Sequence, residues 1–328
     1  MLSPARPARP RRFGFAVVLL AVALTTACGP DLGKQNFPRT TVTASAAPVD
    51  GPIDDPAVTL DVQRVVDPCA LMDPASLATL GTPDEGARYS DDLGECHDQL
   101  TDAGGKQLTL ALTLGDLLIS SSDPEGTIEG LPLQVDKVDD TSCIASAFTD
   151  RNPGLGISVQ VGYEGGDSCG AGQTALQKVL QRMHNNPTRL EQSKGTLLPL
   201  DFCTLIDDGT ITSTLGKGSK GAAYGLHGCS WDGGNASAYF DYRETYAPTA
   251  EEDGRQVDLG NGITGYQQLE TNAGKRCTIK WLHRPTKDDQ GEVVSYQYEN
   301  YHDDAGADDA CGKALTAVKA ALPKLPSP

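Results

Sequence analysis

The sequence lacks a second long apolar run, a Cys-x-x-Cys pair and histidines at metal-ligand spacing. After residues 13–24, no stretch approaches the roughly 20 apolar residues that a membrane-spanning helix needs. The absent cysteine and histidine pairs argue against zinc, and we expect no metal and no cofactor. Basic residues are also scarce, with 27 Lys and Arg against 44 Asp and Glu. Such an acidic chain repels phosphate backbones, so nucleic acid is excluded as a partner.

Residues 1–27 have the organisation of a signal peptide. Four arginines precede the apolar run at 13–24, and small residues follow it up to Ala27. The segment "LTTAC", which ends at Cys28, resembles a bacterial lipobox, in which the cysteine is lipidated and becomes the mature N-terminus. Cleavage by ordinary signal peptidase is the alternative, because Thr25 and Ala27 also satisfy a small-x-small rule.

The number of cysteines favours lipidation of Cys28. Nine cysteines leave one over in an exported chain, and a lipid on Cys28 leaves eight to pair with one another. We therefore predict an anchor on the extracytoplasmic face of the cell membrane. Residues 28–60, rich in Pro, Thr, Ala and Asp, are predicted to be a flexible tether.

Two stretches further along the chain echo each other. "DPCALMDPASLATLG" at 67–81 is repeated as "DFCTLIDDGTITSTLG" at 201–216, and the cysteines that follow fall into step. The first set is Cys69, Cys96, Cys143 and Cys169, and the second is Cys203, Cys229, Cys277 and Cys311. Motif, spacing and order all recur, which indicates an internal duplication with one repeat over 61–190 and another over 196–324.

The eight later cysteines are predicted to form four disulfides, two in each repeat. Four cysteines allow three pairings, and the sequence does not choose between them. We favour first with second and third with fourth, which ties each helix to a strand.

Each repeat is predicted to be an α+β sandwich in which two helices cover one face of about five mainly antiparallel strands. Asp73 and Asp207 are suited to cap a short opening helix, which Gly81 ends in the first repeat. Alternating runs such as "QLTLALTL" and "VVSYQYEN" indicate strands. The closing helices present one apolar face each: Ala175, Leu176, Val179, Leu180 and Met183 in the first, and Leu315, Val318 and Leu322 in the second.

The opening motif, the second cysteine in "GECHDQ" and "GCSWDGG", and the final "DxCG" helix resemble a known family. They are similar to the actinobacterial cell-envelope lipoproteins grouped as domain of unknown function 3558, here in tandem. The resemblance implies export, anchoring and a shared fold. It implies no activity, because the family has no established one.

Several residues could carry chemistry, but each has a simpler interpretation. "GGDSCGAG" at 165–172 faintly resembles a protease nucleophile loop, yet Asp167 or Ser168 as a helix cap accounts for it. Acidic clusters at 91–98 and 303–311 lack the spacing of an EF-hand and are interpreted as solvated loops and caps. None of the five histidines recurs between the repeats: His97, His184, His227, His283 and His302. We predict no catalytic residue.

Aromatic residues are unequally divided. The second repeat holds both Trp and eight of the ten Tyr. Core packing is the first interpretation, and an exposed tyrosine platform for an envelope protein or a glycan is the second. The platform hypothesis predicts that Tyr296 and Tyr298, which share one face of a strand, are partly exposed.

The sequence as a whole predicts a non-enzymatic binding or accessory module of the cell envelope. One alternative is a solute-binding lipoprotein of an import system, although such proteins usually have two doubly wound α/β lobes. The other is an envelope hydrolase, which the lack of a nucleophile–base or metal constellation disfavours.

Overall fold

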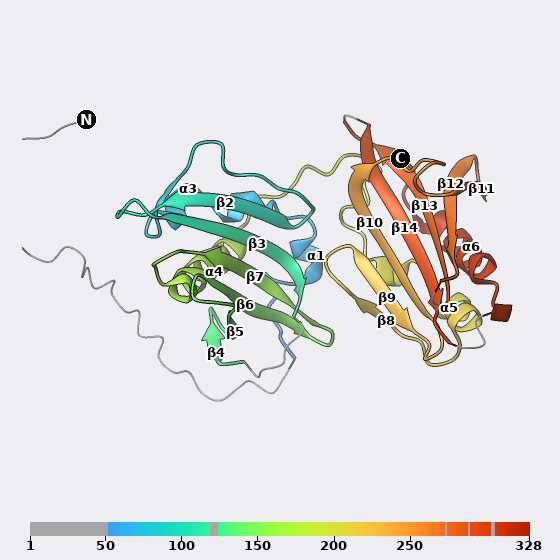
Figure 1. Cartoon of the computed structure of the whole chain (residues 1–328), viewed down its shortest axis with the longest axis horizontal. Coiled ribbons are helices and arrows are strands. Elements are labelled where there is room, and N and C mark those ends of the chain that lie inside the picture. The colour runs from blue at the N-terminus through green and yellow to red at the C-terminus, as the bar shows by residue number, and fades with distance from the viewer. Residues whose placement is uncertain (1–51, 119–123, 273, 288, 303–305) are drawn as a thin grey trace, which may run out of the picture. The chain divides into compact units, whose positions relative to one another are not determined.

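The computed structural model describes residues 52–118, 124–272, 274–287, 289–302 and 306–328. Within these ranges the chain is α+β, with two seven-stranded antiparallel sheets (Figure 1). The predicted signal peptide, Cys28 and most of the predicted tether lie outside the described residues. No helix in the described ranges is long and apolar enough to cross a membrane.

The first sheet follows three short helices and precedes one long helix. The short helices are α1 (Leu60–Gln63), α2 (Pro68–Leu71) and α3 (Pro74–Leu77), and the long helix is α4 (Ser168–His184). The strands are β1 (Thr82–Pro83), β2 (Glu95–Thr101), β3 (Gln107–Leu117), β4 (Gly126–Ile128), β5 (Leu131–Lys137), β6 (Ser142–Arg151) and β7 (Gly154–Gly162). They are ordered β1-β2-β3-β7-β6-β5-β4.

Along the chain, the second sheet follows η2 (Phe202–Thr204) and α5 (Asp208–Leu215). It precedes α6 (Ala310–Ala321) and η4 (Leu322–Lys324). Its strands are β8 (Gly221–Ala223), β9 (Gly228–Asp232), β10 (Ser237–Tyr246), β11 (Arg255–Gly260), β12 (Ile263–Glu270), β13 (Lys275–Pro285) and β14 (Gln290–Asn300). Read from β8, the order β8-β9-β10-β14-β13-β12-β11 matches the first sheet strand for strand. This match is compatible with the predicted duplication.

About five strands were predicted for each sheet, and seven are present. The excess comes from strands such as β1 and β8, which have two and three residues. Runs this short show no alternation of apolar and polar residues, so sequence patterns do not reveal them.

All eight cysteines in the described residues are paired, in the arrangement favoured from the sequence. The pairs are Cys69–Cys96, Cys143–Cys169, Cys203–Cys229 and Cys277–Cys311. Each pair joins a helical segment to a strand: α2 to β2, α4 to β6, η2 to β9 and α6 to β13. The disulfides therefore fix the helical segments before and after each sheet to that sheet.

Aspartates begin the short helices, as predicted. The Asp73 carboxylate accepts a hydrogen bond from the Ala75 amide, and the Asp207 carboxylate accepts one from the Thr210 amide. The first of these helices, α3, ends at Leu77, which is sooner than predicted. Gly81 lacks a positive φ, so its predicted role as a left-handed helix end was wrong. It lies directly before β1, where the chain has already become extended.

Each sheet has a core between one of its faces and the long helix that follows it in the sequence. In Figure 1, α5 and α6 lie behind the second sheet, and β10 and β14 face the viewer. Helix α4 packs on β6 and β7, and α6 packs on β13 and β14. The apolar face predicted for α4 is buried in full. In α6, Val318 is buried and Leu315 is partly buried at the edge of the core. Leu322, which was predicted on the same helix, begins η4 and is also partly buried.

The two cores differ in whether the large side chains come from the sheet or from the helix. Matched through the third cysteine of each repeat, Val159 and Val161 of β7 correspond to Tyr296 and Tyr298 of β14. The helices show the opposite trend. The buried large residues of α4 are Leu176, Val179, Leu180 and Met183. The buried residues of α6 are Ala310, Ala314, Ala317, Val318 and Ala321. Large sheet residues thus oppose small helix residues in the second repeat, and both cores fill.

Candidate binding surface

Tyr296 and Tyr298 are core residues, so the prediction that they are partly exposed was wrong. Both are 0% exposed. Cys277 lies in register with Tyr298 on the neighbouring strand and is bonded to Cys311 in α6, so this face of the sheet meets the helix. Alternation along a strand shows that two residues share a face, but it does not show which face is covered.

The opposite face of the second sheet carries a row of polar and aromatic side chains, and we call it the open face. Tyr239 of β10, Gln297 of β14, Thr278 of β13 and Gln268 of β12 lie side by side on it. The next row contains Asp241, Ser295, Lys280 and Tyr266. All eight except Gln268, which is exposed, are partly buried. The centre of the open face is therefore polar.

Glu299 near the end of β14 holds the ring of Tyr301 on this face and lies near Tyr239. The Tyr301 hydroxyl donates a hydrogen bond to the Glu299 carboxylate at 2.8 Å, and Gln297 donates to the same oxygen at 3.0 Å. Tyr239 lies close enough to Glu299 for the charge of that carboxylate to act on its hydroxyl. Arg276 donates to the Tyr301 hydroxyl and lies over its ring, with 5.8 Å between the guanidinium carbon and the ring centroid. Tyr301 is nevertheless 50% exposed.

Asp241 holds a third ring beside these two. The Tyr224 hydroxyl donates to the Asp241 carboxylate at 2.7 Å. The rings of Tyr224 and Tyr239 meet edge to face with 5.8 Å between centroids. Tyr224 and Tyr301 are thus each hydrogen-bonded to a carboxylate, and Tyr239 is positioned by the Tyr224 ring.

The environment of these groups alters their acidity. Burial, followed by the charge of Glu299, raises the pKa of Tyr239 above its ordinary value. Burial also raises the pKa of Asp241, in spite of the hydrogen bond from Tyr224. The tyrosines therefore remain protonated donors at neutral pH.

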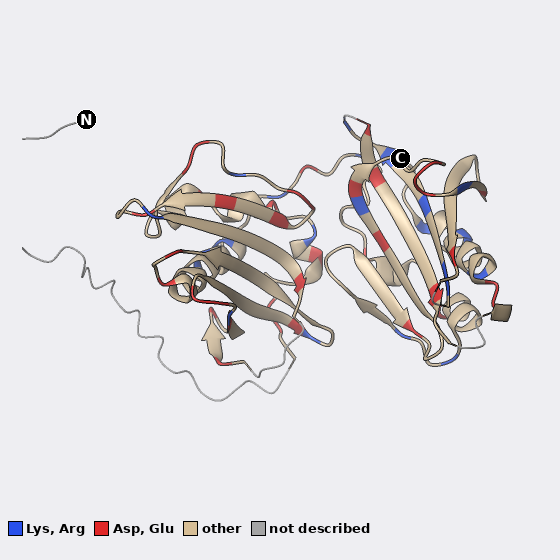
Figure 2. Ribbon diagram, viewed as in Figure 1, with Lys and Arg blue, Asp and Glu red and all other residues tan. Residues whose placement is uncertain are grey.

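Charged residues of both signs stand among these rings. Figure 2 shows acidic and basic residues close together on the strands of the second sheet. Lys280 pairs with Asp253 at 2.7 Å, and Arg276 lies 3.4 Å from Glu299. The basic groups of the open face are thus engaged with carboxylates and do not form a site for an anion.

The first sheet has no such aromatic group at the matching places. Leu112 of β3 is in register with Cys96, and Phe240 of β10 is in register with Cys229. The residues before them, Ala111 and Tyr239, therefore correspond. Gly162 of β7 corresponds to Glu299 by the register with the third cysteine. Gln160 and Ser158, in contrast, match Gln297 and Ser295. The polar centre is common to both sheets, and the tyrosines are specific to the second.

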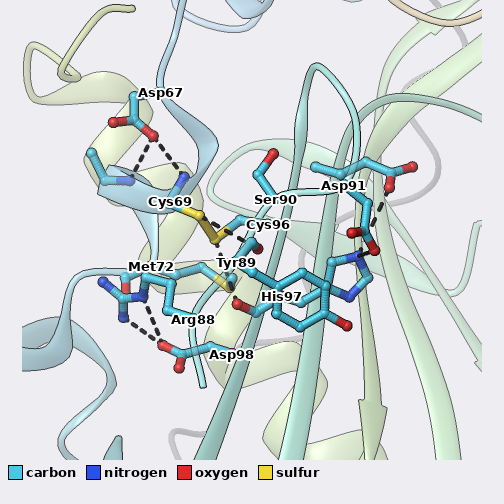
Figure 3. Close-up of a disulfide and its surroundings, with 12 residues drawn as sticks. Asp67, Cys69, Met72, Arg88, Tyr89, Ser90, Asp91, Cys96, His97 and Asp98 are labelled. Carbon is cyan, nitrogen blue, oxygen red and sulfur yellow. Dashed lines mark hydrogen bonds and ion pairs between the residues drawn. A yellow bond between two sulfur atoms is a disulfide. The ribbon is translucent and has the colours of Figure 1, made fainter. Parts of the chain in front are cut away.

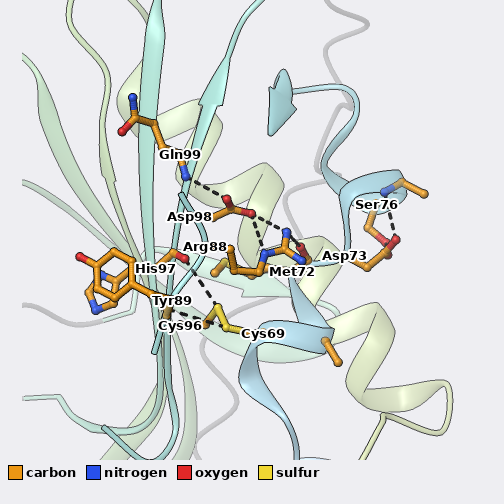
Figure 4. A network of polar contacts seen from close by, with 12 residues as sticks. Cys69, Met72, Asp73, Ser76, Arg88, Tyr89, Cys96, His97, Asp98 and Gln99 are labelled. Carbon is orange, nitrogen blue, oxygen red and sulfur yellow. Dashed lines mark hydrogen bonds and ion pairs between the residues drawn. A yellow bond between two sulfur atoms is a disulfide. The ribbon is translucent and has the colours of Figure 1, made fainter. Parts of the chain in front are cut away.

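A second cluster of contacts surrounds the Cys69–Cys96 disulfide (Figure 3). The Tyr89 and His97 rings stack with 4.7 Å between centroids, and the His97 Nε2 atom lies 3.8 Å from an Asp91 carboxylate oxygen. On the other side of the strand, Arg88 donates to Asp98 and to the Met72 carbonyl oxygen (Figure 4). These contacts hold the 88–98 segment against the disulfide.

A polar pocket of about 480 Å³ lies beside α5 and the start of α6. The Asp308 carboxylate accepts hydrogen bonds in its wall from the Tyr298 hydroxyl at 2.6 Å and from the Asn300 amide at 3.0 Å. The Lys313 ammonium completes the cluster at 2.8 Å from both Asp308 and Tyr298. The Tyr298 ring is thus buried in the core, while its hydroxyl group takes part in the polar wall of this pocket.

The other residues considered from the sequence have structural places. Asp167 caps α4 through the Gly170 amide, and Ser168 is buried in the first turn. His184 contacts Asp55 at 2.8 Å. His227 is buried, and burial lowers its pKa to about 3. Among the described residues, no group of three or more His, Cys, Asp or Glu could hold a metal ion. The cluster at 303–311 is described only from residue 306.

Comparisons with known proteins add little. No family model and no curated protein matches the sequence. Two solved structures are aligned over most of the chain. DynU16, a protein of the dynemicin biosynthetic locus, is 12% identical over 84% of this chain and 93% of its own, with a TM-score of 0.15. BexL, a di-domain ARO/CYC protein of the BE-7585A biosynthetic pathway, is 11% identical over 84% and 92%, with a TM-score of 0.16. Scores this low carry no argument about fold or function.

Proposed function

We propose that the protein is an exported, lipid-anchored lipoprotein of the cell envelope that acts as a non-enzymatic binding or accessory module. In this proposal the chain is built from two tandem repeats, each a sandwich of helices on one sheet, and resembles domain of unknown function 3558. One observation carries the proposal: eight of the nine cysteines pair with one another, and the remaining cysteine is Cys28.

The cysteine pairing supports export because disulfides persist in oxidising compartments and are rare in the cytosol. It supports lipidation because a free thiol in such a compartment needs a partner or a modification. Cys28 follows an apolar run and small residues, which is the sequence context of a lipidated cysteine.

The open face supports the binding role. Tyr224 and Tyr301 are hydrogen-bonded to carboxylates and Tyr239 packs on Tyr224, so little conformational entropy is lost when a ligand lies against these rings. Tyrosine is also enriched in binding surfaces, because its ring buries well while its hydroxyl stays hydrogen-bonded.

The experiment that tests this proposal is expression of the full chain in an actinobacterial host, followed by mass spectrometry of the membrane fraction. The expected product begins at Cys28 and carries a diacylglycerol modification. The Cys28→Ser variant is the matched control, and it should give no product with this modification. A wild-type chain in the soluble fraction with an unmodified cysteine would contradict the anchor.

A solute-binding lipoprotein is the second candidate, and the pocket beside Asp308 favours it. A thermal-shift screen with small polar solutes tests it. A solute that raises the melting temperature of the wild type but not of a Lys313→Met variant would support this candidate, and a screen without any shift would count against it.

A further inference from the structure

We infer that the open face binds a neutral, hydroxyl-rich glycan chain, with the rings of Tyr239 and Tyr301 as its stacking platforms. This inference rests on the binding role proposed above and names the ligand class of that surface.

The rings are positioned before any ligand arrives. Tyr301 is hydrogen-bonded to Glu299 and lies against Arg276, and the Tyr239 ring packs edge to face on the Tyr224 ring. One face of a sugar ring presents C–H groups, and these pack well on the negative face of an aromatic ring. A ring with its hydroxyl tied down and half its surface in solvent, as Tyr301 is, suits this contact.

The polar groups between the rings match sugar hydroxyls. Gln297 and Thr278 lie in the same row as Tyr239, and each offers both a donor and an acceptor. The carboxylates of Asp241 and Glu299 are strong acceptors for hydroxyl donors. A hydroxyl group both donates and accepts, so it can satisfy such a mixed surface.

Charge separates a neutral glycan from anionic polymers. The chain has a net charge of −17, and the basic groups of the open face already contact carboxylates. A sulfated or phosphorylated polymer would meet carboxylates without free cations to offset them. A neutral polymer meets no such repulsion.

The composition of the face separates a glycan from a protein partner. The centre of a protein–protein interface is about 65% apolar, with its polar groups at the rim. Here the order is reversed, because Thr278, Ser295 and Gln297 occupy the centre and aromatic rings stand around them. The surface is also extended: β10, β14 and β13 are adjacent, so their spacing gives about 10 Å across. This breadth suits a chain of several sugars.

The experiment is affinity electrophoresis of the full-length protein in detergent through gels that contain a soluble glucan, a mannan or an arabinogalactan. We expect at least one of these neutral polysaccharides to retard the wild type, and dextran sulfate not to retard it. Tyr239→Ala with Tyr301→Ala should weaken the binding about tenfold or more, because each lost stacking contact is worth about threefold to tenfold.

Matched controls keep the result interpretable. Tyr246→Ala removes a tyrosine that is 67% exposed at the far end of β10, and it should bind as the wild type does. Tyr301→Ala alone removes a half-exposed ring and avoids disturbing the sheet. The inference is overturned if no neutral polysaccharide retards the wild type. It is also overturned if the wild type, the Tyr239→Ala/Tyr301→Ala variant and the Tyr301→Ala variant are all retarded equally. These outcomes are independent of the modification of Cys28, so they can be told apart from failure of the proposed anchor.

Discussion

Arg88 and Asp98 form an ion pair in which two guanidinium nitrogens, Nε and Nη2, donate to one carboxylate oxygen (Figure 4). The Asp98 side chain is only 1% exposed. Removal of Arg88 would leave a buried carboxylate unpaired, which typically costs 3–5 kcal/mol. We therefore expect Arg88→Met to lower the free energy of unfolding by about 3 kcal/mol, measured by guanidinium denaturation with the disulfides intact.

The double variant Arg88→Met/Asp98→Leu is the control for this prediction. It removes both charges, so it should recover most of the stability that the single variant loses. A single variant that loses less than about 1 kcal/mol would show that water reaches the Asp98 carboxylate.

Two neighbouring core tyrosines should respond in opposite ways to loss of the hydroxyl group. The Tyr296 hydroxyl is buried and has no hydrogen-bond partner among the described residues, whereas the Tyr298 hydroxyl contacts Asp308 and Lys313. Tyr296→Phe should therefore raise the free energy of unfolding by about 0.5–1 kcal/mol, and Tyr298→Phe should lower it by about 1–2 kcal/mol. Urea denaturation of both variants measures the difference. Equal changes in the two variants would contradict it.

His227 should make the protein less stable in mild acid. Burial lowers its pKa from 6.5 to about 3, so between these values the unfolded chain binds a proton that the folded chain does not. The stabilisation is complete above pH 6.5 and is lost as the pH falls toward 3. From pH 7 to pH 5 the wild type should lose about 2 kcal/mol more than His227→Phe, measured by urea denaturation at both values. Equal losses would mean that His227 accepts a proton in the folded state.

The Cys203–Cys229 disulfide should contribute about 3–4 kcal/mol through the loop of 26 residues that it closes. Replacing both cysteines with alanine removes the bond without leaving a thiol. The free energy of unfolding of this double variant should fall by that amount. Addition of dithiothreitol should then change its stability less than that of the wild type, because one of the four bonds is already absent.

The sequence predicted the class of fold, because it follows from local patterns. It left three pairings open for each set of four cysteines, and the favoured pairing is the one present. Alternation identified the long strands, and the apolar face of α4 was read correctly from Ala175 to Met183. Exposure of Tyr296 and Tyr298 could not be predicted, because it depends on which face α6 covers. The register of Cys277 with Tyr298 decides this, and register is a long-range property.

The open face was missed for the same reason. Tyr239 and Tyr301 are separated by more than sixty positions in the sequence, and only pairing of β10 with β14 brings both to Glu299. One signal was available: odd-numbered residues of "SAYFDYRE" at 237–244 alternate with Ala238, Phe240 and Tyr242, which have the character of core residues. That pattern placed Tyr239 on the face away from the core.

The different placement of large side chains in the two cores affects which helix can pack on which sheet. Because the two sheets have the same strand order, each of the helices α4 and α6 could also pack on the other sheet. Helix α6, which offers mainly alanine, would leave voids above Val159 and Val161, and α4 would bring Leu180 and Met183 against tyrosines. Voids and crowding both cost several kcal/mol. Each helix therefore fits the sheet on which it packs better than it would fit the other sheet.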